Sequence, residues 1–296
     1  MHRRLWWALL VLAAVATGPV VADSGSTCAD CHDDVAADMT HQIHMRIKPF
    51  EVQGRAVGCE GCHGDGAAHA EEGDAALIRT FKVQDDLAVC VDCHSGKGRD
   101  LHEWQASNHA MEGIGCLDCH GVHVAKDPLA SCAGCHPAVM AQMQLPSHHP
   151  VREGKMSCVS CHNPHRSTEA MLRTDMRVND LCYDCHQSKE GPVIFEHAPV
   201  VEDCRLCHVP HGAVADNLLT ANEPMLCLQC HEIHFHAGLV SPEGPVVVGG
   251  TEFQNPHGRR GMNLAFTTKC SQCHSRIHGT DLPSQTLTSG GRGLTR

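Results

Sequence analysis

Residues 158–165 read C-V-S-C-H-N-P-H, and the Cys-x-x-Cys-His pattern in this stretch occurs ten times in the chain of 296 residues. We number these motifs 1 to 10 in chain order. They contain all 20 cysteines, and each ends in a histidine. The cysteine pairs are Cys28 and Cys31, Cys59 and Cys62, Cys90 and Cys93, Cys116 and Cys119, Cys132 and Cys135, Cys158 and Cys161, Cys182 and Cys185, Cys204 and Cys207, Cys227 and Cys230, and Cys270 and Cys273. The motif histidines are His32, His63, His94, His120, His136, His162, His186, His208, His231 and His274.

This pattern is the attachment sequence of c-type haem. The two thiols bond covalently to the haem vinyl groups, and the adjacent histidine becomes the proximal ligand of the iron. Zinc sites would pair the dithiols and leave ten histidines unexplained, and a disulfide framework would need neither the fixed gap nor the histidine. The sequence therefore predicts ten covalently attached haems and a role in electron transfer.

The first 22 residues are typical of a secretion signal. Arg3 and Arg4 provide a positive start, and the apolar run of residues 5–16 is shorter than the roughly 20 residues that span a bilayer. Residues 20–22, V-V-A, form a cleavage site, although an uncleaved anchor is the alternative. Because haem attachment to this motif takes place outside the cytoplasm, we expect a periplasmic or outer-membrane-associated protein. No later segment has the composition of a lipid-spanning helix.

The composition favours a core made of haem. Aromatic residues are only 3% of the chain, which also has 27 glycines and 15 prolines and no long helical periodicity. We therefore expect an elongated, loop-rich multihaem cytochrome c with short α-helices wrapped around a chain of haems and little or no β-sheet. Residues 23–285 would form this domain in two halves, about 23–136 and 137–285, before a flexible tail at 286–296. The net charge of −11 argues against a nucleic-acid partner.

An internal repeat suggests the distal iron ligands. The repeated unit consists of an upstream histidine, a motif, a second histidine and another motif. It is clearest over residues 148–186 and 197–231. This frame nominates His148 and His44, with His149 and His41 as open alternatives to them, and it leaves His102, His234 and His236 for surface positions or for contacts with the iron ligands. The ten distal candidates are His44, His69, His109, His123, His148, His165, His197, His211, His257 and His278. The count predicts bis-histidine ligation, which gives lower potentials than His/Met ligation.

Spacing limits how these ligands can pair. A histidine three or four residues after a motif histidine cannot reach the opposite face of the same haem. We therefore expect His123, His165, His211 and His278 each to ligate a different haem and so to link successive haems. The upstream histidines have enough chain to serve the motif that follows them.

Three stretches resemble the decahaem cytochromes of the MtrA/DmsE/PioA type: G-C-E-G-C-H-G-D-G-A-A-H at 58–69, L-P-S-H-H-P-V-R-E-G-K-M-S-C-V-S-C-H-N-P-H at 145–165, and residues 255–284. One departure is Arg166, where that family often has glycine. The resemblance implies a protein that sits inside an outer-membrane β-barrel porin and carries electrons between the periplasm and the cell exterior. It also implies a periplasmic cytochrome as donor or acceptor, and a surface multihaem cytochrome, a reductase or ferrous iron at the other end.

Two other functions compete with this conduit. One is a soluble periplasmic electron shuttle, which would not co-purify with a barrel. The other is a multihaem reductase, which needs an iron with an open distal site. Because every motif has its histidine and distal candidates suffice, we expect an electron carrier with no catalytic residues rather than an enzyme.

Overall fold

The computed structural model describes residues 28–46, 51–52, 55–56, 58–81, 87–94, 101, 103–231, 245–248, 251–254, 267–272, 274–283 and 294. The predicted signal at 1–22, most of the predicted tail at 286–296, and the positions of His102, His234, His236, His257 and Cys273 lie outside them.

The chain forms two compact units. Unit 1 comprises residues 1–93 and 120–125, and unit 2 comprises residues 94–119 and 126–296. They do not coincide with the two halves expected from the repeat, 23–136 and 137–285, which stay a prediction about the sequence. The elements of unit 1 are α2 (Asp33–Met39), α3 (Ile43–Arg46), β1 (Glu51–Val52), β2 (Arg55–Ala56), α4 (Cys59–His63), α5 (Ala67–Glu72), the 3-10 helix η1 (Ala75–Leu77) and α6 (Leu87–His94), which ends at the boundary with unit 2.

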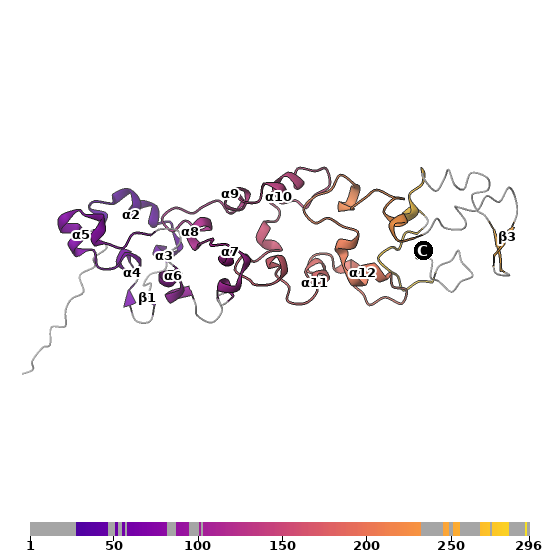
Figure 1. The fold of residues 1–296 in the computed structure, drawn as a ribbon, viewed down its shortest axis with the longest axis horizontal. Coiled ribbons are helices and arrows are strands. Elements are labelled where there is room, and N and C mark those ends of the chain that lie inside the picture. Colours follow the sequence, from indigo (N-terminus) through magenta and orange to yellow (C-terminus); the bar gives the residue numbers. More distant parts are fainter. Residues whose placement is uncertain are drawn as a thin grey trace, which may run out of the picture. The chain divides into compact units, whose positions relative to one another are not determined.

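Unit 2 consists of short helices joined by loops (Figure 1). Its α-helices are α7 (Asn108–Met111), α8 (Cys116–Cys119), α9 (Pro128–Ala133), α10 (Pro137–Gln142), α11 (Val178–Tyr183) and α12 (Ala198–Glu202). Its 3-10 helices are η2 (Trp104–Ala106), η3 (Cys158–Ser160), η4 (Glu169–Met171), η5 (Gln187–Lys189), η6 (Cys204–Leu206), η7 (Asp216–Leu218), η8 (Cys227–Gln229) and η10 (Cys270–Gln272).

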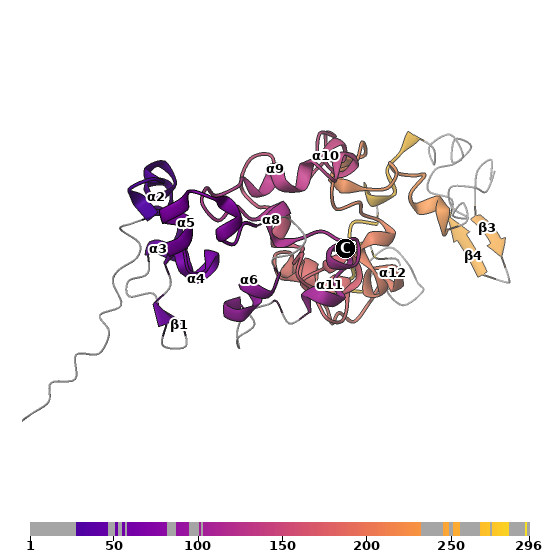
Figure 2. The same cartoon turned by 60° about the vertical axis from the view of Figure 1, so that its left-hand side comes forward.

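Strand structure in the described residues amounts to two antiparallel hairpins. In one, β1 pairs with β2, with Glu51 opposite Ala56. In the other, β3 (Pro245–Val248) pairs with β4 (Thr251–Gln254), with Val246 opposite Phe253 (Figure 2). The expectation of a loop-rich fold with short helices and little β-sheet is confirmed.

Most haem motifs form a single helical turn, and motif 3 ends the longer helix α6. In motif 1 the His32 amide donates to the Cys28 carbonyl at 2.9 Å, four residues earlier. The same bond closes motifs 5 to 10 at 2.9–3.0 Å. Because residues three and four apart lie on one face of a helix, this turn brings both thiols and the imidazole to the same side.

Prolines help to explain why the helices between motifs are short. Pro128 and Pro137 open α9 and α10, and Pro199 lies in the first turn of α12. Proline is tolerated in the first turn because its missing N–H would have no helical partner there. Asp127 caps α9 by accepting from the Leu129 amide at 3.0 Å. Helices with such fixed starting points set the chain direction between haem motifs.

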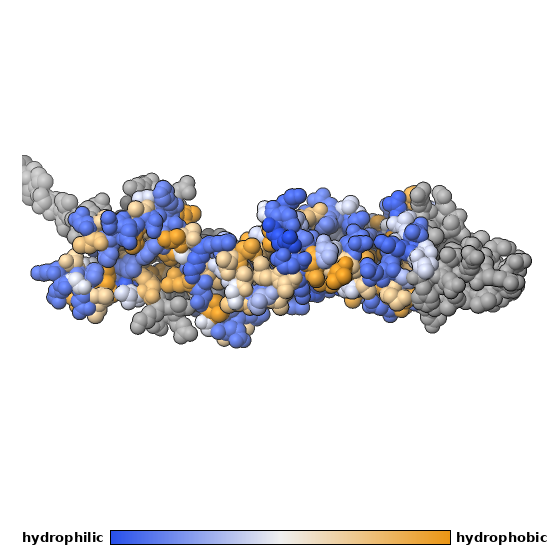
Figure 3. Space-filling model, turned by 90° about the horizontal axis from the view of Figure 1, so that it is seen from above, coloured by the Kyte–Doolittle hydropathy of each residue, from blue (hydrophilic) through white to orange (hydrophobic). Residues whose placement is uncertain are grey.

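Few side chains of the described part are buried. The apolar ones are Trp104, Met143, Ala213 and Ala215, whereas Met176 is 88% exposed and Ile194 73%. Figure 3 shows apolar residues spread among polar ones on the visible face. So small an apolar core cannot by itself offset the conformational entropy of a chain of this length. Among the described residues, no helix is both long and apolar enough to cross a membrane.

Candidate haem-binding sites

Seven motif histidines each face one histidine from outside the motifs. Their ring centroids lie 5.9–6.3 Å apart. That gap is wider than a direct stacking contact, and it fits one metal ion bonded to a nitrogen of each ring at about 2 Å. The pairs are His32 with His69, His63 with His123, His136 with His109, His162 with His211, His186 with His149, His208 with His278, and His231 with His197. The residues present therefore fit a haem iron held between two imidazoles.

Six of the seven pairs follow one of two patterns; the exception is His69, which follows motif 2 and faces His32 of motif 1. A histidine just after a motif faces the histidine of the motif two places earlier: His211 follows motif 8 and faces His162 of motif 6. This agrees with the expectation that such histidines serve a different haem. An upstream histidine faces the histidine of the second motif after it and not that of the first: His109 precedes motif 4 but faces His136 of motif 5. The expectation that upstream histidines serve the motif that follows them directly is corrected here, since the chain turns back only after the second motif.

The choice of His148 over His149 is also corrected. The His149 ring lies 6.3 Å from the His186 ring, and its Nδ1 donates to the Pro210 carbonyl at 2.6 Å. His148 uses both nitrogens elsewhere: Nδ1 contacts the Leu145 carbonyl at 2.6 Å and Nε2 contacts Glu153 at 3.1 Å. Hydrogen bonding to Glu153 raises the pKa of His148. Aligning the repeat with His197 nominated His148, whereas the ring that faces a motif histidine is that of His149.

Backbone carbonyls orient many of the paired rings. A carbonyl oxygen only accepts, so each Nδ1 in such a contact carries the proton and Nε2 is left to bind iron. Among motif histidines, His63 contacts the Arg79 carbonyl at 2.8 Å, His162 that of Ala170 at 2.9 Å and His208 that of Asn217 at 2.8 Å. Among distal candidates, His69 contacts Asp74 at 3.0 Å and His197 contacts Ile277 at 3.0 Å. Sequence reasoning missed these contacts because backbone acceptors leave no residue-type signal.

Two of these carbonyls come from unusual loops. Ala170 and Met171, and again Asn217 and Leu218, are consecutive non-glycine residues with φ between 50° and 57°. This left-handed conformation costs roughly 1–2 kcal/mol per residue. The first residue of each pair accepts from the motif histidine, and the second accepts from the residue after that histidine at 2.7 Å. Strained backbone thus occurs twice at equivalent positions, where it aims carbonyls at the proximal ring.

A small polar cluster holds the loop that carries His165. The Trp104 ring, 8% exposed, lies edge-on to His165 with centroids 5.8 Å apart. Glu103 accepts from the Ser167 amide at 2.9 Å and from its hydroxyl at 3.0 Å. Arg166 forms an ion pair with Asp175 and lies 3.9 Å from Glu103. Arg166, the departure from the resembling family, therefore helps to fix this loop.

The thiols of consecutive motifs lie close to one another. Burial, followed by the neighbouring Cys158 thiol, raises the pKa of Cys132 to about 11. The same causes, with Cys204 and Cys270 as the neighbours, raise the pKa of Cys182 and of Cys227 to about 12. The first cysteine of one motif interacts with the first cysteine of the next motif in four pairs: Cys28 with Cys59, Cys132 with Cys158, Cys182 with Cys204, and Cys227 with Cys270. Second cysteines interact in the pairs Cys62 with Cys93, Cys119 with Cys135, Cys161 with Cys185, and Cys207 with Cys230.

These contacts alternate along the chain. In unit 2 every two consecutive motifs from motif 4 to motif 10 share one such contact. The contact alternates along the chain between a pair of second cysteines and a pair of first cysteines. Consecutive haems attached there would adjoin at alternating edges, in the order of the sequence. Such close haem contacts favour electron transfer from one iron to the next.

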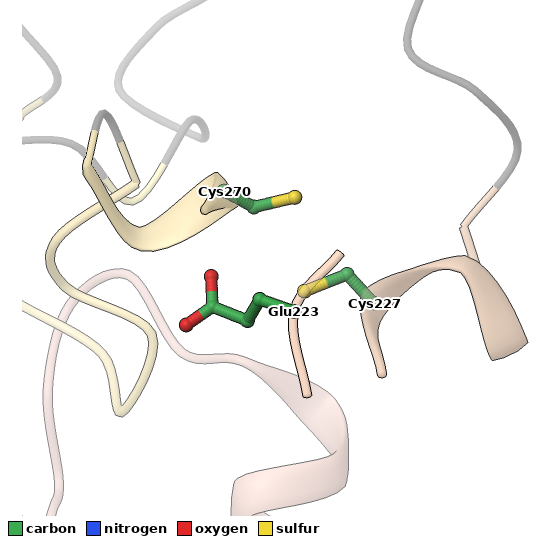
Figure 4. A group of neighbouring side chains, drawn as sticks. All are labelled: Glu223, Cys227 and Cys270. Atoms are coloured by element: carbon green, nitrogen blue, oxygen red, sulfur yellow. The ribbon is translucent and has the colours of Figure 1, made fainter. Parts of the chain in front are cut away.

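In the described residues, Glu223, Cys227 and Cys270 form one group with metal-ligand chemistry, with ligand atoms within 4.8 Å of one another (Figure 4). The two thiols are the first cysteines of motifs 9 and 10. Because haem attachment consumes both sulfur atoms, we do not assign a separate metal site there.

Comparisons with known proteins support the assignment of the CxxCH motifs to haem c. A family model described as a doubled CXXCH motif matches residues 148–191 and 197–234, and one described as cytochrome c-type protein NrfB-like matches residues 59–133. The chain is a multihaem c-type cytochrome that binds haem c through its CxxCH motifs.

A particular relative is multiheme cytochrome MtrA of Shewanella baltica, 35% identical over 193 residues. That match covers 62% of this chain and 55% of the relative, so the chain spans about half the length of this relative. The resemblance to MtrA-type cytochromes drawn from the motifs is confirmed. A solved undecaheme cytochrome from the S-layer of Carboxydothermus ferrireducens matches 78% of this chain and 34% of its own, at 20% identity and a TM-score of 0.17, a value too low to indicate a shared fold.

Proposed function

We propose that this cytochrome is an electron conduit in which ten bis-histidine haems carry electrons between the periplasm and the cell exterior inside an outer-membrane β-barrel porin. A periplasmic cytochrome would exchange electrons at one end, and a surface multihaem cytochrome or a reductase at the other. The observation that carries this proposal is the set of seven facing histidine pairs, combined with the thiol contacts between consecutive motifs.

Bis-histidine ligation is supported by the ring separations and by the Nδ1 contacts described above. Seven irons would use the pairs described, which leaves His44, His165 and His257 as distal candidates for motifs 3, 4 and 10. Bound haem would supply one-electron exchange between Fe(II) and Fe(III), which requires no transfer of a proton or group by the protein. The protein residues fix the two axial rings, the spacing of the haems and the charge around them.

Bis-histidine ligation at every iron would favour a carrier without substrate turnover. An iron with two protein imidazoles has no free position for nitrite, hydroxylamine or a sulfur oxyanion. We therefore propose that the chain is not a reductase. Binding of carbon monoxide to a substantial share of the reduced wild-type haems would contradict this proposal.

The route across the membrane is tested by fractionation and reconstitution. Outer membranes extracted in mild detergent are separated by size-exclusion chromatography, and the haem-bearing fractions are examined for a barrel-sized partner. The complex is then placed in liposomes that enclose an oxidised dye, and an external reductant is added. Co-elution and dye reduction support the conduit. Recovery of the cytochrome alone in the periplasmic fraction would instead favour a soluble shuttle.

A further inference from the structure

Asn179 lies just before motif 7 and contacts motif 8, and Glu223 lies just before motif 9 and contacts motif 10. Asn179, 1% exposed in α11, accepts from the Cys204 amide at 2.8 Å, and its amide group donates to the Val200 and Val201 carbonyls at 2.9 and 3.2 Å. Glu223 accepts from the Ser271 amide at 2.7 Å and from its hydroxyl at 2.8 Å. Each side chain thus satisfies an amide in the first turn of the next motif, where helical N–H groups lack partners.

These two contacts occur where first cysteines meet. The Cys182 and Cys204 side chains are neighbours at Asn179, and the Cys227 and Cys270 sulfur atoms lie within 4.8 Å of each other and of a Glu223 carboxylate oxygen. Figure 4 shows the Glu223 carboxylate between the segments that carry Cys227 and Cys270. The two side chains therefore link the segments that would attach haems 7 and 8 and haems 9 and 10.

The two bridges differ in charge. Asn179 is neutral, whereas Glu223 places a carboxylate within 4.8 Å of both first thiols of its pair. Its carboxylate oxygens accept hydrogen bonds from Ser271 and form no ion pair with a Lys or Arg among the described residues. A nearby negative charge stabilises Fe(III) haem, which carries one more positive charge than Fe(II) haem.

We propose that Glu223 is a positioning residue that bridges haems 9 and 10 and, through its charge, holds their reduction potentials below those of the pair bridged by Asn179. The proposal rests on haem attachment at motifs 9 and 10, and it goes beyond the conduit function because it assigns a potential step to one place in the chain of haems. It applies in whichever direction electrons flow.

The test uses the full-length holoprotein and the Glu223→Gln variant. Glutamine keeps an acceptor for the Ser271 amide and removes the charge. In a spectroelectrochemical titration, the reduction potentials of two haems should become more positive, while those of the other haems should not change. The matched control is Glu190→Gln, which removes an exposed carboxylate four residues after the motif 7 histidine and should leave the titration curve unchanged. Ser271→Ala keeps the carboxylate and removes one hydrogen bond, so the low potentials should persist in it.

Intact mass separates failure of this inference from failure of the haem assignment. A wild-type mass with fewer than ten haems, with motif 9 or 10 vacant by peptide mapping, would remove its basis. With ten haems present in every variant, a Glu223→Gln curve that overlays wild type would overturn the inference. A Glu223→Gln curve displaced as a whole, equally with Glu190→Gln, would also overturn it, because the effect would then be one of net charge.

Discussion

Each distal candidate can bind iron through only one ring nitrogen, and a hydrogen bond to the other nitrogen determines which one is available. His149 donates Nδ1 to the Pro210 carbonyl and turns its remaining edge toward His186, whereas His148 has both nitrogens engaged by Leu145 and Glu153. Two adjacent histidines with the same side chain therefore have different roles, set by their contacts.

We predict that His149→Ala opens one haem iron. Loss of the distal imidazole should convert the motif 7 haem from low to high spin, and the reduced protein should bind carbon monoxide at one haem per chain. The haem count should stay the same because the thioether bonds are intact. His148→Ala is the control and should keep the low-spin spectrum. Carbon monoxide binding to His148→Ala but not to His149→Ala would restore the assignment made from the repeat.

Strain at Ala170 leads to a second prediction at this scale. Ala170 has φ 50°, and glycine adopts that conformation without the clash of a side chain. Ala170→Gly should therefore raise the free energy of unfolding by about 1 kcal/mol, while the carbonyl stays on His162. Ala141→Gly, at an exposed position in α10, should lower it by about 0.5–1 kcal/mol. Chemical denaturation followed by the Soret band measures both; a loss of stability in Ala170→Gly would show that the loop is not strained.

At the scale of elements, the short turns that carry the cysteines depend on capping by polar side chains. Asp203 precedes η6, accepts from the Arg205 amide at 2.7 Å and pairs with the Arg205 guanidinium at 2.8 Å. The Arg205 hydrogen bond lowers the pKa of Asp203 from its ordinary 3.8. A carboxyl whose folded pKa is depressed stabilises the fold above its ordinary pKa, and this stability is lost as the pH falls through the folded pKa.

Asp203→Asn should therefore destabilise the protein in a pH-dependent way. Asparagine still caps η6, so the change isolates the charge, and we expect a loss of about 0.5 kcal/mol at pH 7 because the pair is partly exposed. The difference from wild type should shrink as the pH falls below 3.8 and through the lower folded pKa. Urea denaturation of both proteins across this range tests it, and a constant difference at every pH would assign the effect to packing instead of charge.

Part of the haem-binding arrangement could be predicted from the sequence. The motif turns were predictable because Cys-x-x-Cys-His is a local signal. Six histidines nominated from the repeat face motif histidines in the structure: His69, His109, His123, His197, His211 and His278. The identity of each partner was not predictable. His278 facing His208 and His211 facing His162 depend on where the chain folds back, which no local spacing records. The same holds for Asn179 and Glu223, whose partners lie 25 and 48 residues away.

At the scale of the whole molecule, the contacts described here organise cofactor positions more than they bury apolar surface. The described part buries the side chains of Trp104, Met143, Ala213 and Ala215, while the large apolar residues Met176, Ile194 and Val214 stay at least 73% exposed. Much of the missing apolar contact must come from the haems. Ten macrocycles, each linked at two thioether bonds and two axial rings, would tie distant parts of the chain together and reduce the entropy of the unfolded state.

The chain without haem should therefore have no stable tertiary structure. We expect the apoprotein, produced in a strain that lacks the haem attachment machinery, to give a far-UV circular dichroism spectrum of a largely unfolded chain, with no cooperative thermal transition. The holoprotein should unfold cooperatively and resist limited proteolysis within residues 103–231. The reason is that few buried residues remain to offset chain entropy once the haems are removed. A cooperative transition in the apoprotein would mean that the protein scaffold forms first and that the haems fill sites already in place.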